Sequence, residues 1–121
     1  MPIAIVWFEI PTLDFERAVK FYSDILGTPV RVQEYMGHTL GILTIDGESI
    51  GEITPPTPDQ TPSPNGTRLY LTCEGRLDEV AGRVEGAGGK IVQPKRSIGD
   101  PGWIVLIGDT EGNVVGLHSA T

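Results

Sequence analysis

Two segments of the sequence decide the fold: FERAVKFYSDILG at residues 15–27 and LDEVAGRVEGAGG at residues 77–89. In the first, apolar side chains recur at the spacing of one helix face, namely at Phe15, Ala18, Val19, Tyr22, Ile25 and Leu26. Thr12 or Asp14 can cap the start of this helix, and Gly27 suits its end. The second segment repeats the pattern at Leu77, Val80, Ala81, Val84 and Ala87, before Gly88-Gly89. Each segment therefore predicts an amphipathic helix.

The same order of strands surrounds both helices. β-branched and alternating segments predict strands at 3–10, 30–35, 40–45 and 49–54, and again at 67–73, 90–93, 102–107 and 113–118. Asp46-Gly47 is typical of a two-residue hairpin. Sliding one half over the other by 62 residues places Phe15 on Leu77 and Gly27 on Gly89. We therefore predict an α+β fold of two tandem βαβββ modules, which form a curved, half-barrel mixed sheet with a central cup.

The segment between the halves, residues 55–66, holds five prolines among polar residues and predicts a stiff, extended linker. The predicted organisation is one domain over 1–121, with module one at 1–54, the linker at 55–66 and module two at 67–121. The net charge of −7 and the lack of a basic run argue against nucleic-acid binding. Residues 2–8 are too short for a signal peptide, and no apolar run approaches a membrane span, so we expect a cytoplasmic protein. Cys73 lies in an alternating strand and predicts a buried thiol.

Three groups of residues resemble one known family. They are the opening at residues 7–11, 13–18 and 21–22, the Ala87-Gly88-Gly89 that leads into Pro94, and the ending at residues 109–119, DTEGNVVGLHS. Together they resemble the vicinal-oxygen-chelate superfamily of glyoxalases, bleomycin-resistance proteins and extradiol dioxygenases, and within it the lactoylglutathione-lyase-like branch. The resemblance implies paired βαβββ modules, a cup for a small-molecule ligand or substrate, a homodimer and, in many members, a divalent metal.

The resemblance also implies where a metal would be held. One position falls on each of four strands, and in this sequence these positions are Trp7, Glu52, Arg68 and Gly116. Only Glu52 can ligate a metal, and a catalytic divalent ion usually has two or three protein ligands. The usual four-ligand site is therefore not predicted to be intact.

Strand alternation suggests another set of site residues in place of the four implied metal positions. Side chains two residues apart share a face, so Glu9 lies with Trp7, Tyr70 with Arg68, and His118 with Gly116. We interpret Glu9, Glu52 and His118 as candidate catalytic groups, and as the candidate ligands if a loosely held divalent metal binds. The candidate substrate-binding residues are Trp7, Arg68, Tyr70 and Trp103. The alternatives are an outward-facing Glu9, a partly exposed His118, a surface Arg68 and plain core aromatics.

The leading hypothesis is a small-molecule enzyme or enzyme-like protein that carries out lyase-type or isomerase-type proton transfer in the cup. The alternative is a metal-free protein that binds and sequesters a drug or metabolite, whose acidic mouth would attract a cationic or flat compound. A third is an accessory domain that serves oligomerisation. Residues 94–103 are either a lid or an ordinary long loop, and His38 predicts a solvated turn.

Overall fold

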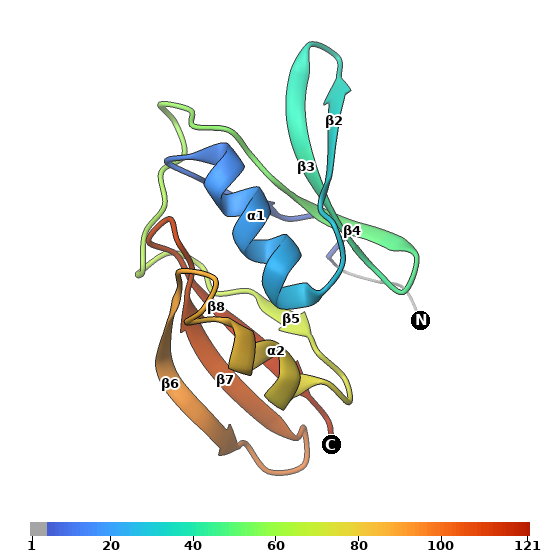
Figure 1. Ribbon diagram of the computed structural model, residues 1–121, viewed down its shortest axis with the longest axis vertical. Coiled ribbons are helices and arrows are strands. Elements are labelled where there is room, and N and C mark those ends of the chain that lie inside the picture. Colours follow the sequence, from blue (N-terminus) through green and yellow to red (C-terminus); the bar gives the residue numbers. More distant parts are fainter. Residues whose placement is uncertain (1–4) are drawn as a thin grey trace.

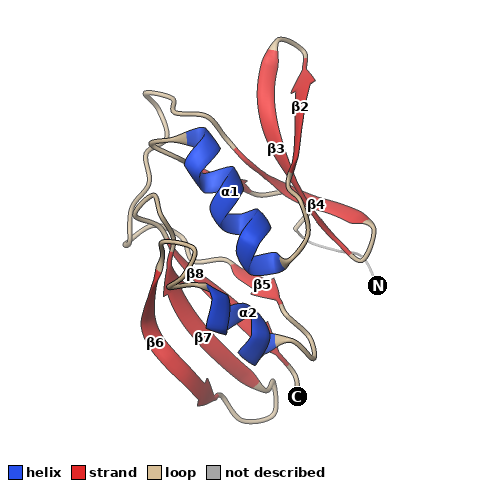
Figure 2. Cartoon of the chain, viewed as in Figure 1, coloured by secondary structure: helices blue, strands red, loops and turns tan. Residues whose placement is uncertain are grey.

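The computed structural model describes residues 5–121 and divides them between two similar modules (Figure 1, Figure 2). Module one contains β1 (Glu9–Ile10), α1 (Phe15–Leu26), β2 (Arg31–Tyr35), β3 (His38–Ile45) and β4 (Glu48–Ile53). Module two contains β5 (Tyr70–Thr72), α2 (Leu77–Arg83), β6 (Lys90–Ser97), β7 (Trp103–Gly108) and β8 (Val114–Ser119). Among these described elements, no helix is long and apolar enough to cross a membrane.

Each module forms its own mixed sheet of four strands. The strand orders are β1-β4-β3-β2 and β5-β8-β7-β6, and in both sheets the first pair is parallel and the others antiparallel. The predicted α+β fold of two βαβββ modules is therefore confirmed. The sheets share no strand, and a common apolar core with both helices joins the modules.

The backbone register shows which positions of the two modules correspond. The amide of Glu52 donates to the carbonyl of Phe8 over 2.9 Å, and the amide of Gly116 donates to the carbonyl of Leu69 over 2.9 Å. Glu52 in β4 is therefore equivalent to Gly116 in β8. Their partners across the parallel pair are Glu9 and Tyr70, which are equivalent in turn.

Helix α1 begins and ends where its capping residues predict. The Asp14 side chain accepts from the amide of Arg17, and Gly27 adopts a left-handed conformation with φ of 70°. Of the two candidate N-caps, Asp14 takes the role, while the Thr12 hydroxyl donates to the carbonyl of Thr54. The apolar face of α1 is buried against β4 and α2.

Module two holds α1 at both ends. Glu111, in the β7–β8 turn, accepts from the amides of Leu13 and Asp14 and pairs with Arg17 at 2.7 Å. At the other end, Arg76 and Arg83 donate to the carbonyls of Leu26 and Ile25, respectively. An anion thus lies at the helix N-terminus and cations lie at its C-terminus, the arrangement that the helix dipole favours.

Glu111 and Asp109 form the most densely bonded polar cluster between the modules. Burial works to raise the pKa of Glu111, but hydrogen bonds from Arg17, Asp14, Thr110 and the Leu13 amide outweigh it and lower this pKa to about 2. Asp109 accepts from the buried Tyr22 hydroxyl at 2.7 Å. Burial, followed by the charge of Asp109, raises the pKa of Tyr22 well above its ordinary value. The β7–β8 turn therefore anchors the first helix of the chain.

Several predicted boundaries need correction. The strand predicted over 67–73 is only Tyr70–Thr72, and the second helix, predicted to reach Gly88-Gly89, ends at Arg83. The strand predicted over 3–10 is only Glu9–Ile10 among the described residues, with residues 3 and 4 outside them. The lid or loop predicted over 94–103 is wrong for its first half, because β6 continues to Ser97 and leaves a short loop at 98–102. Pro94 is tolerated in β6 because β6 is an edge strand, where a missing amide costs little, and register shifts flank it.

The β2–β3 hairpin projects from the body of the molecule (Figure 1). All five residues of β2 are exposed, and Val32, Tyr35 and Met36 leave large apolar surface uncovered. His38 is exposed, as predicted, but it begins β3, because the turn itself is Met36-Gly37. The second hairpin turns at Asp46-Gly47, where both residues have positive φ, as their sequence predicts.

Candidate functional site

Glu52 is the most unusual side chain of the sheet in module one. It is only 7% exposed, although it is a carboxylate in a strand whose neighbours Gly51 and Ile53 are also buried. The indole Nε1 of Trp7 donates to Glu52 Oε1 over 2.8 Å. The other oxygen, Oε2, is buried and has no hydrogen-bond partner among the described residues. A buried acceptor without a donor is costly, and such groups are commonly found at functional sites.

Glu52 and Glu9 line one cavity of about 500 Å³. Glu9 is the register partner of Glu52 in the parallel β1–β4 pair, so both carboxylates face the same side of the sheet. Asp59 of the linker adds a third acid, and the walls include Tyr35, Leu40 and the linker prolines. We call this cavity, defined by Glu9, Glu52, Asp59 and these walls, the acidic cleft. No lysine or arginine is among its described lining residues.

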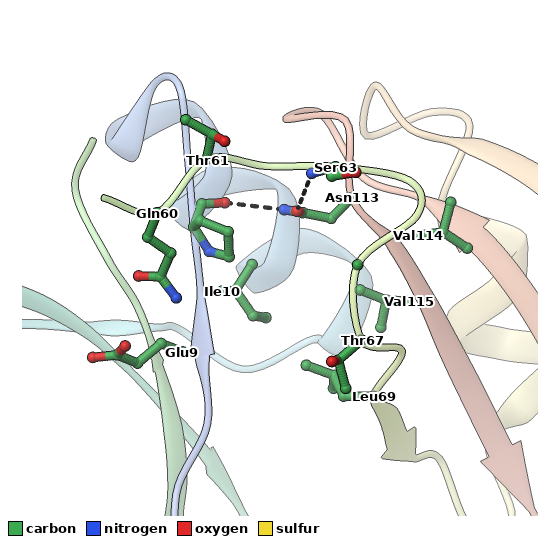
Figure 3. Close-up of a pocket in the computed structure, with 12 residues that line it drawn as sticks. Glu9, Ile10, Gln60, Thr61, Ser63, Thr67, Leu69, Asn113, Val114 and Val115 are labelled. Atoms are coloured by element: carbon green, nitrogen blue, oxygen red, sulfur yellow. Dashed lines mark hydrogen bonds between the residues drawn. The ribbon is translucent and has the colours of Figure 1, made fainter. Parts of the chain in front are cut away.

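A smaller cavity of about 290 Å³ lies beside the acidic cleft, under the linker (Figure 3). Glu9 and Gln60 line both cavities, and Figure 3 shows the Gln60 side chain extending toward Glu9. The buried Asn113 fixes the linker here, since its Nδ2 donates to the carbonyl of Pro11 and its Oδ1 accepts from the amide of Ser63. The linker is thus a wall of the site that is held to module two, and Asn113 in turn joins module two to module one.

The equivalent region of module two is filled differently. A side chain at Gly116 would collide with the ring of Tyr70, which lies over that position. Arg68 and Tyr70 line an apolar groove of about 840 Å³, shared with Val6, Phe8 and Ile50. These two predicted substrate-binding residues therefore lie together but outside the acidic cleft.

His118 and Trp103 lie outside the acidic cleft and the apolar groove, where β7 begins and β8 ends. The His118 Nε2 atom is 2.7 Å from the carbonyl oxygen of Pro101, in the loop between β6 and β7. The Trp103 ring, half-buried, has the Lys95 ammonium 5.2 Å from its centroid. Neither residue lines the acidic cleft. Of the predicted site residues, the structure brings together Trp7, Glu9 and Glu52 and separates them from Arg68, Tyr70, Trp103 and His118.

The four positions implied for a metal do not fit one in this chain. Trp7 presents an indole N–H, which donates to Glu52 rather than ligating, and Tyr70 occupies the space in front of Gly116. Arg68 brings a further cation. Within residues 5–121, no three histidine, cysteine, aspartate or glutamate side chains gather closely enough to hold an ion. The chemistry of the acidic cleft is accordingly derived from its side chains alone.

Two features of the cleft were missed by sequence reasoning. Asp59 and Tyr35 were assigned to a spacer and to an ordinary strand, because neither stands in a recognisable motif. The orphaned oxygen of Glu52 was also unforeseen, since the sequence does not report which carboxylates are buried. The prediction for Cys73 is confirmed: the thiol is 3% exposed, and burial raises its pKa to about 11, which makes it a poor nucleophile.

Comparisons with known proteins agree with this architecture. Two curated relatives, from Mycobacterium bovis and Mycobacterium tuberculosis, carry the name "Putative glyoxylase CFP32"; each is 30% identical over 123 residues, or 94% of this chain. The chain spans 44% of the length of these relatives.

Solved structures of other proteins share the fold. TnmS3, an antibiotic-binding protein from Streptomyces sp. CB03234, is 22% identical with a TM-score of 0.74, and the match covers 100% of this chain and 99% of that one. The fosfomycin resistance protein FosX from Listeria monocytogenes is 16% identical with a TM-score of 0.70, covering 100% and 96%. The family model of the Glyoxalase/Bleomycin resistance protein/Dioxygenase superfamily matches residues 4–117, and the chain therefore belongs to that superfamily.

Proposed function

We propose that this chain is a small-molecule enzyme that transfers a proton within its substrate, with Glu52 as the general base. The observation that carries the proposal is the buried Oε2 atom of Glu52, which lacks a hydrogen-bond partner among residues 5–121. Oε2 is covered in this structure, so a substrate reaches it when the cleft wall opens, and no described protein donor then competes for this oxygen. Its position in a cavity of about 500 Å³ leaves room for a small organic molecule.

Trp7 and Glu9 have supporting roles in this proposal. The Trp7 indole holds Oε1 over 2.8 Å, so the carboxylate cannot rotate freely and Oε2 keeps one direction. Glu9 is exposed and lies across the strand pair from Glu52. It can accept the proton from the substrate or from water and pass it to solvent. Glu52 would take a proton from one atom of the substrate and return it to another, which is an isomerisation, or release it as a leaving group departs, which is an elimination.

His118 stays a predicted third catalytic group. Its contact with Pro101 keeps it outside the acidic cleft of the same chain, so nothing in the cleft supports a direct role. The variant His118→Ala decides the question. If it abolishes the activity while its thermal unfolding is unchanged, His118 acts in the site, and if activity is intact, the assignment is wrong.

The proposal is tested by hydrogen exchange into candidate substrates. The purified protein is incubated in D₂O with a panel of α-hydroxycarbonyl, epoxide and amino compounds, and proton NMR follows the loss of carbon-bound hydrogen. We expect exchange that falls by about 100-fold or more in Glu52→Gln and by less in Glu9→Gln. Glu48→Gln, a change of the same kind in the exposed first residue of β4, is the matched control and should keep full activity. Undiminished exchange in Glu52→Gln would refute the assignment of the base.

A second candidate function is metal-free binding and sequestration of a small molecule. It is favoured by the position of His118 outside the cleft that Glu9 and Glu52 line, so the three predicted catalytic groups do not meet in one cavity. A compound that raises the melting temperature and is recovered unchanged after long incubation would support this function. Turnover of the same compound would exclude it for that ligand.

We also propose a homodimer. The apolar residues Val32, Tyr35 and Met36 are exposed on the projecting β2–β3 hairpin, and a second copy would bury them. Light scattering should give twice the chain mass at micromolar concentration, and Val32→Glu combined with Met36→Glu should reduce it to the monomer mass. A monomer in the unmodified protein would contradict the proposal. A cytoplasmic location likewise stays a prediction.

A further inference from the structure

We infer that residues 55–62 of the linker form a strap that opens to admit a ligand to the acidic cleft, and that the strap turns about its two fixed ends at Thr54 and Ser63. This inference rests on the site described under the proposed function and assigns that site a gate. It concerns access to the cleft, so it applies whether or not the ligand is then transformed.

The need for an opening follows from the burial of the site. Glu52 is 7% exposed, and its Oε2 atom is covered. The strap forms one wall of the acidic cleft, through Pro55, Pro56, Thr57, Asp59 and Gln60. A wall of the cleft must therefore move before a ligand contacts Oε2.

Both ends of the strap are fixed to the body of the molecule. Before the strap, the amide of Thr54 donates to the carbonyl of Ile10 over 2.9 Å, and the Thr54 carbonyl accepts from the Thr12 hydroxyl over 2.7 Å. After the strap, the amide of Ser63 donates to Asn113 Oδ1 over 3.3 Å. The strap can therefore swing about these two ends without leaving the molecule.

Between these ends, the strap bonds only to itself within the described part of the chain. Thr57 and Asp59 share hydrogen bonds, and Thr57 pairs with Gln60 through an isolated β-bridge. No residue of the strap is buried. By contrast, β3, which supplies another wall of the cleft, is hydrogen-bonded to both β2 and β4. A segment without buried contacts or bonds to the body opens at low cost, so the strap is the wall that moves.

The prolines of the strap determine how it moves. Four of its eight residues, at 55, 56, 58 and 62, are prolines, whose rings fix the backbone φ angle. Such a stiff segment moves as a unit rather than folding into the cleft. Gln60 lines both the acidic cleft and the smaller cavity, and its side chain extends toward Glu9, which also lines both (Figure 3). Lifting the strap therefore removes Gln60 from between the cavities and leaves one larger space.

The test measures how fast a thiol behind the strap is modified. Glu52→Cys places a reporter thiol at the covered position, and the native Cys73, buried in the shared apolar core, is the internal reference. Iodoacetamide is the probe, and mass spectrometry of peptides measures the label at each thiol separately. A covered thiol reacts only when its surroundings open, so the rate at the reporter measures how often the cleft opens.

We expect Pro62→Gly, which frees the backbone inside the strap, to speed modification of the reporter thiol about threefold or more, because a less restricted chain favours the open ensemble. Modification of Cys73 should be unchanged. Pro64→Gly makes the same change just beyond the fixed end at Ser63 and is the matched control. It should leave the rates at both thiols as they are.

Three results would overturn the inference. The first is an unchanged reporter rate in Pro62→Gly. The second is an equal increase at Cys73, which would mean that the whole fold opens rather than the strap. The third is an equal increase in Pro64→Gly, which would mean that the linker does not turn at Ser63.

This outcome is separate from that of the proposed function, because the labelling involves no substrate and the reporter variant lacks the proposed base. If the strap controls labelling while no compound exchanges hydrogen in D₂O, the gate stands and the proton-transfer proposal fails. If exchange depends on Glu52 but Pro62→Gly leaves labelling unchanged, the gate fails and the assignment of the base stands.

Discussion

Glu52 and Gly116 occupy the same position in the two modules, yet one is a buried acid and the other is covered by a ring. In each case the amide donates to a carbonyl of the parallel strand over 2.9 Å. In module one the side chain reaches Trp7 and a cavity, while in module two the ring of Tyr70 fills the equivalent space. The backbone of this position is thus the same in both modules, while the side chains there differ in their chemistry.

This difference shows that the residues that maintain the repeated fold are distinct from the residues that form the site. The core, the strand order and the parallel pairs are common to both modules, and side chains from module two hold the helix of module one. The acidic cleft, in contrast, belongs to module one and the linker alone. Variants in the shared scaffold should therefore change stability, whereas variants in the cleft should change binding and leave or even improve stability.

The largest effect is expected from Glu111→Ala, which removes the anchor that module two provides for α1. This side chain is fully buried and accepts from two backbone amides and Arg17. Losing the hydrogen bonds that these three donors make to a buried carboxylate costs about 3 kcal/mol or more. Chemical denaturation should show this loss, and a loss below about 0.5 kcal/mol would mean that the modules are not coupled through this turn.

A related prediction concerns the stability of the fold at low pH. The folded pKa of Glu111 is about 2, below its ordinary value, so its contribution is present above about pH 4.5 and is lost as the pH falls toward 2. The shift corresponds to about 3 kcal/mol of unfolding free energy. Denaturation of the unmodified protein between pH 6 and pH 2.5 should show this decline, and Glu111→Gln should show a shallower one. Equal slopes in the two proteins would contradict the role of Glu111.

A smaller effect is expected from Gly116→Ala. The added methyl group would collide with the Tyr70 ring, and overpacking of this kind costs about 1–3 kcal/mol. Tyr70 is partly exposed, so the second change Tyr70→Ala should restore much of the loss. Thermal unfolding of the single and double variants measures both. If Gly116→Ala alone is neutral, the ring does not hold that position, and the contrast with Glu52 weakens.

The smallest change in stability is expected from Glu52→Gln, which should stabilise the fold rather than destabilise it. Removing the charge of a buried carboxylate that has one incomplete oxygen should stabilise the fold by about 1 kcal/mol, while Gln can still accept from Trp7. A higher melting temperature with loss of ligand binding would mark a residue kept for function. A clear destabilisation would instead indicate that Glu52 has a structural role.

Local signals were sufficient to predict most of the fold. The bounds of α1 were predictable because Asp14 and Gly27 stand at its ends, and the Asp46-Gly47 turn was predictable because few residues tolerate its backbone. Strand ends that depend on distant pairing were not predictable. The strand predicted over 3–10 shrank to Glu9–Ile10 among described residues, and β6 ran past Pro94 because no partner needs its amide at the sheet edge.

The site was predictable only in part, because its arrangement depends on contacts far apart in the sequence. Alternation placed Glu9 beside Trp7, and the family resemblance identified Glu52. No local pattern could show that Tyr70 covers Gly116 or that His118 turns to Pro101. The role of Glu111 was missed for the same reason, since its partner Arg17 lies 94 residues away.

The most direct test of the central claim compares hydrogen exchange in D₂O catalysed by the unmodified protein, by Glu52→Gln and by Glu48→Gln. The account predicts that exchange of carbon-bound hydrogen falls by about 100-fold or more in Glu52→Gln and is unchanged in Glu48→Gln. Equal exchange in all three proteins would contradict it.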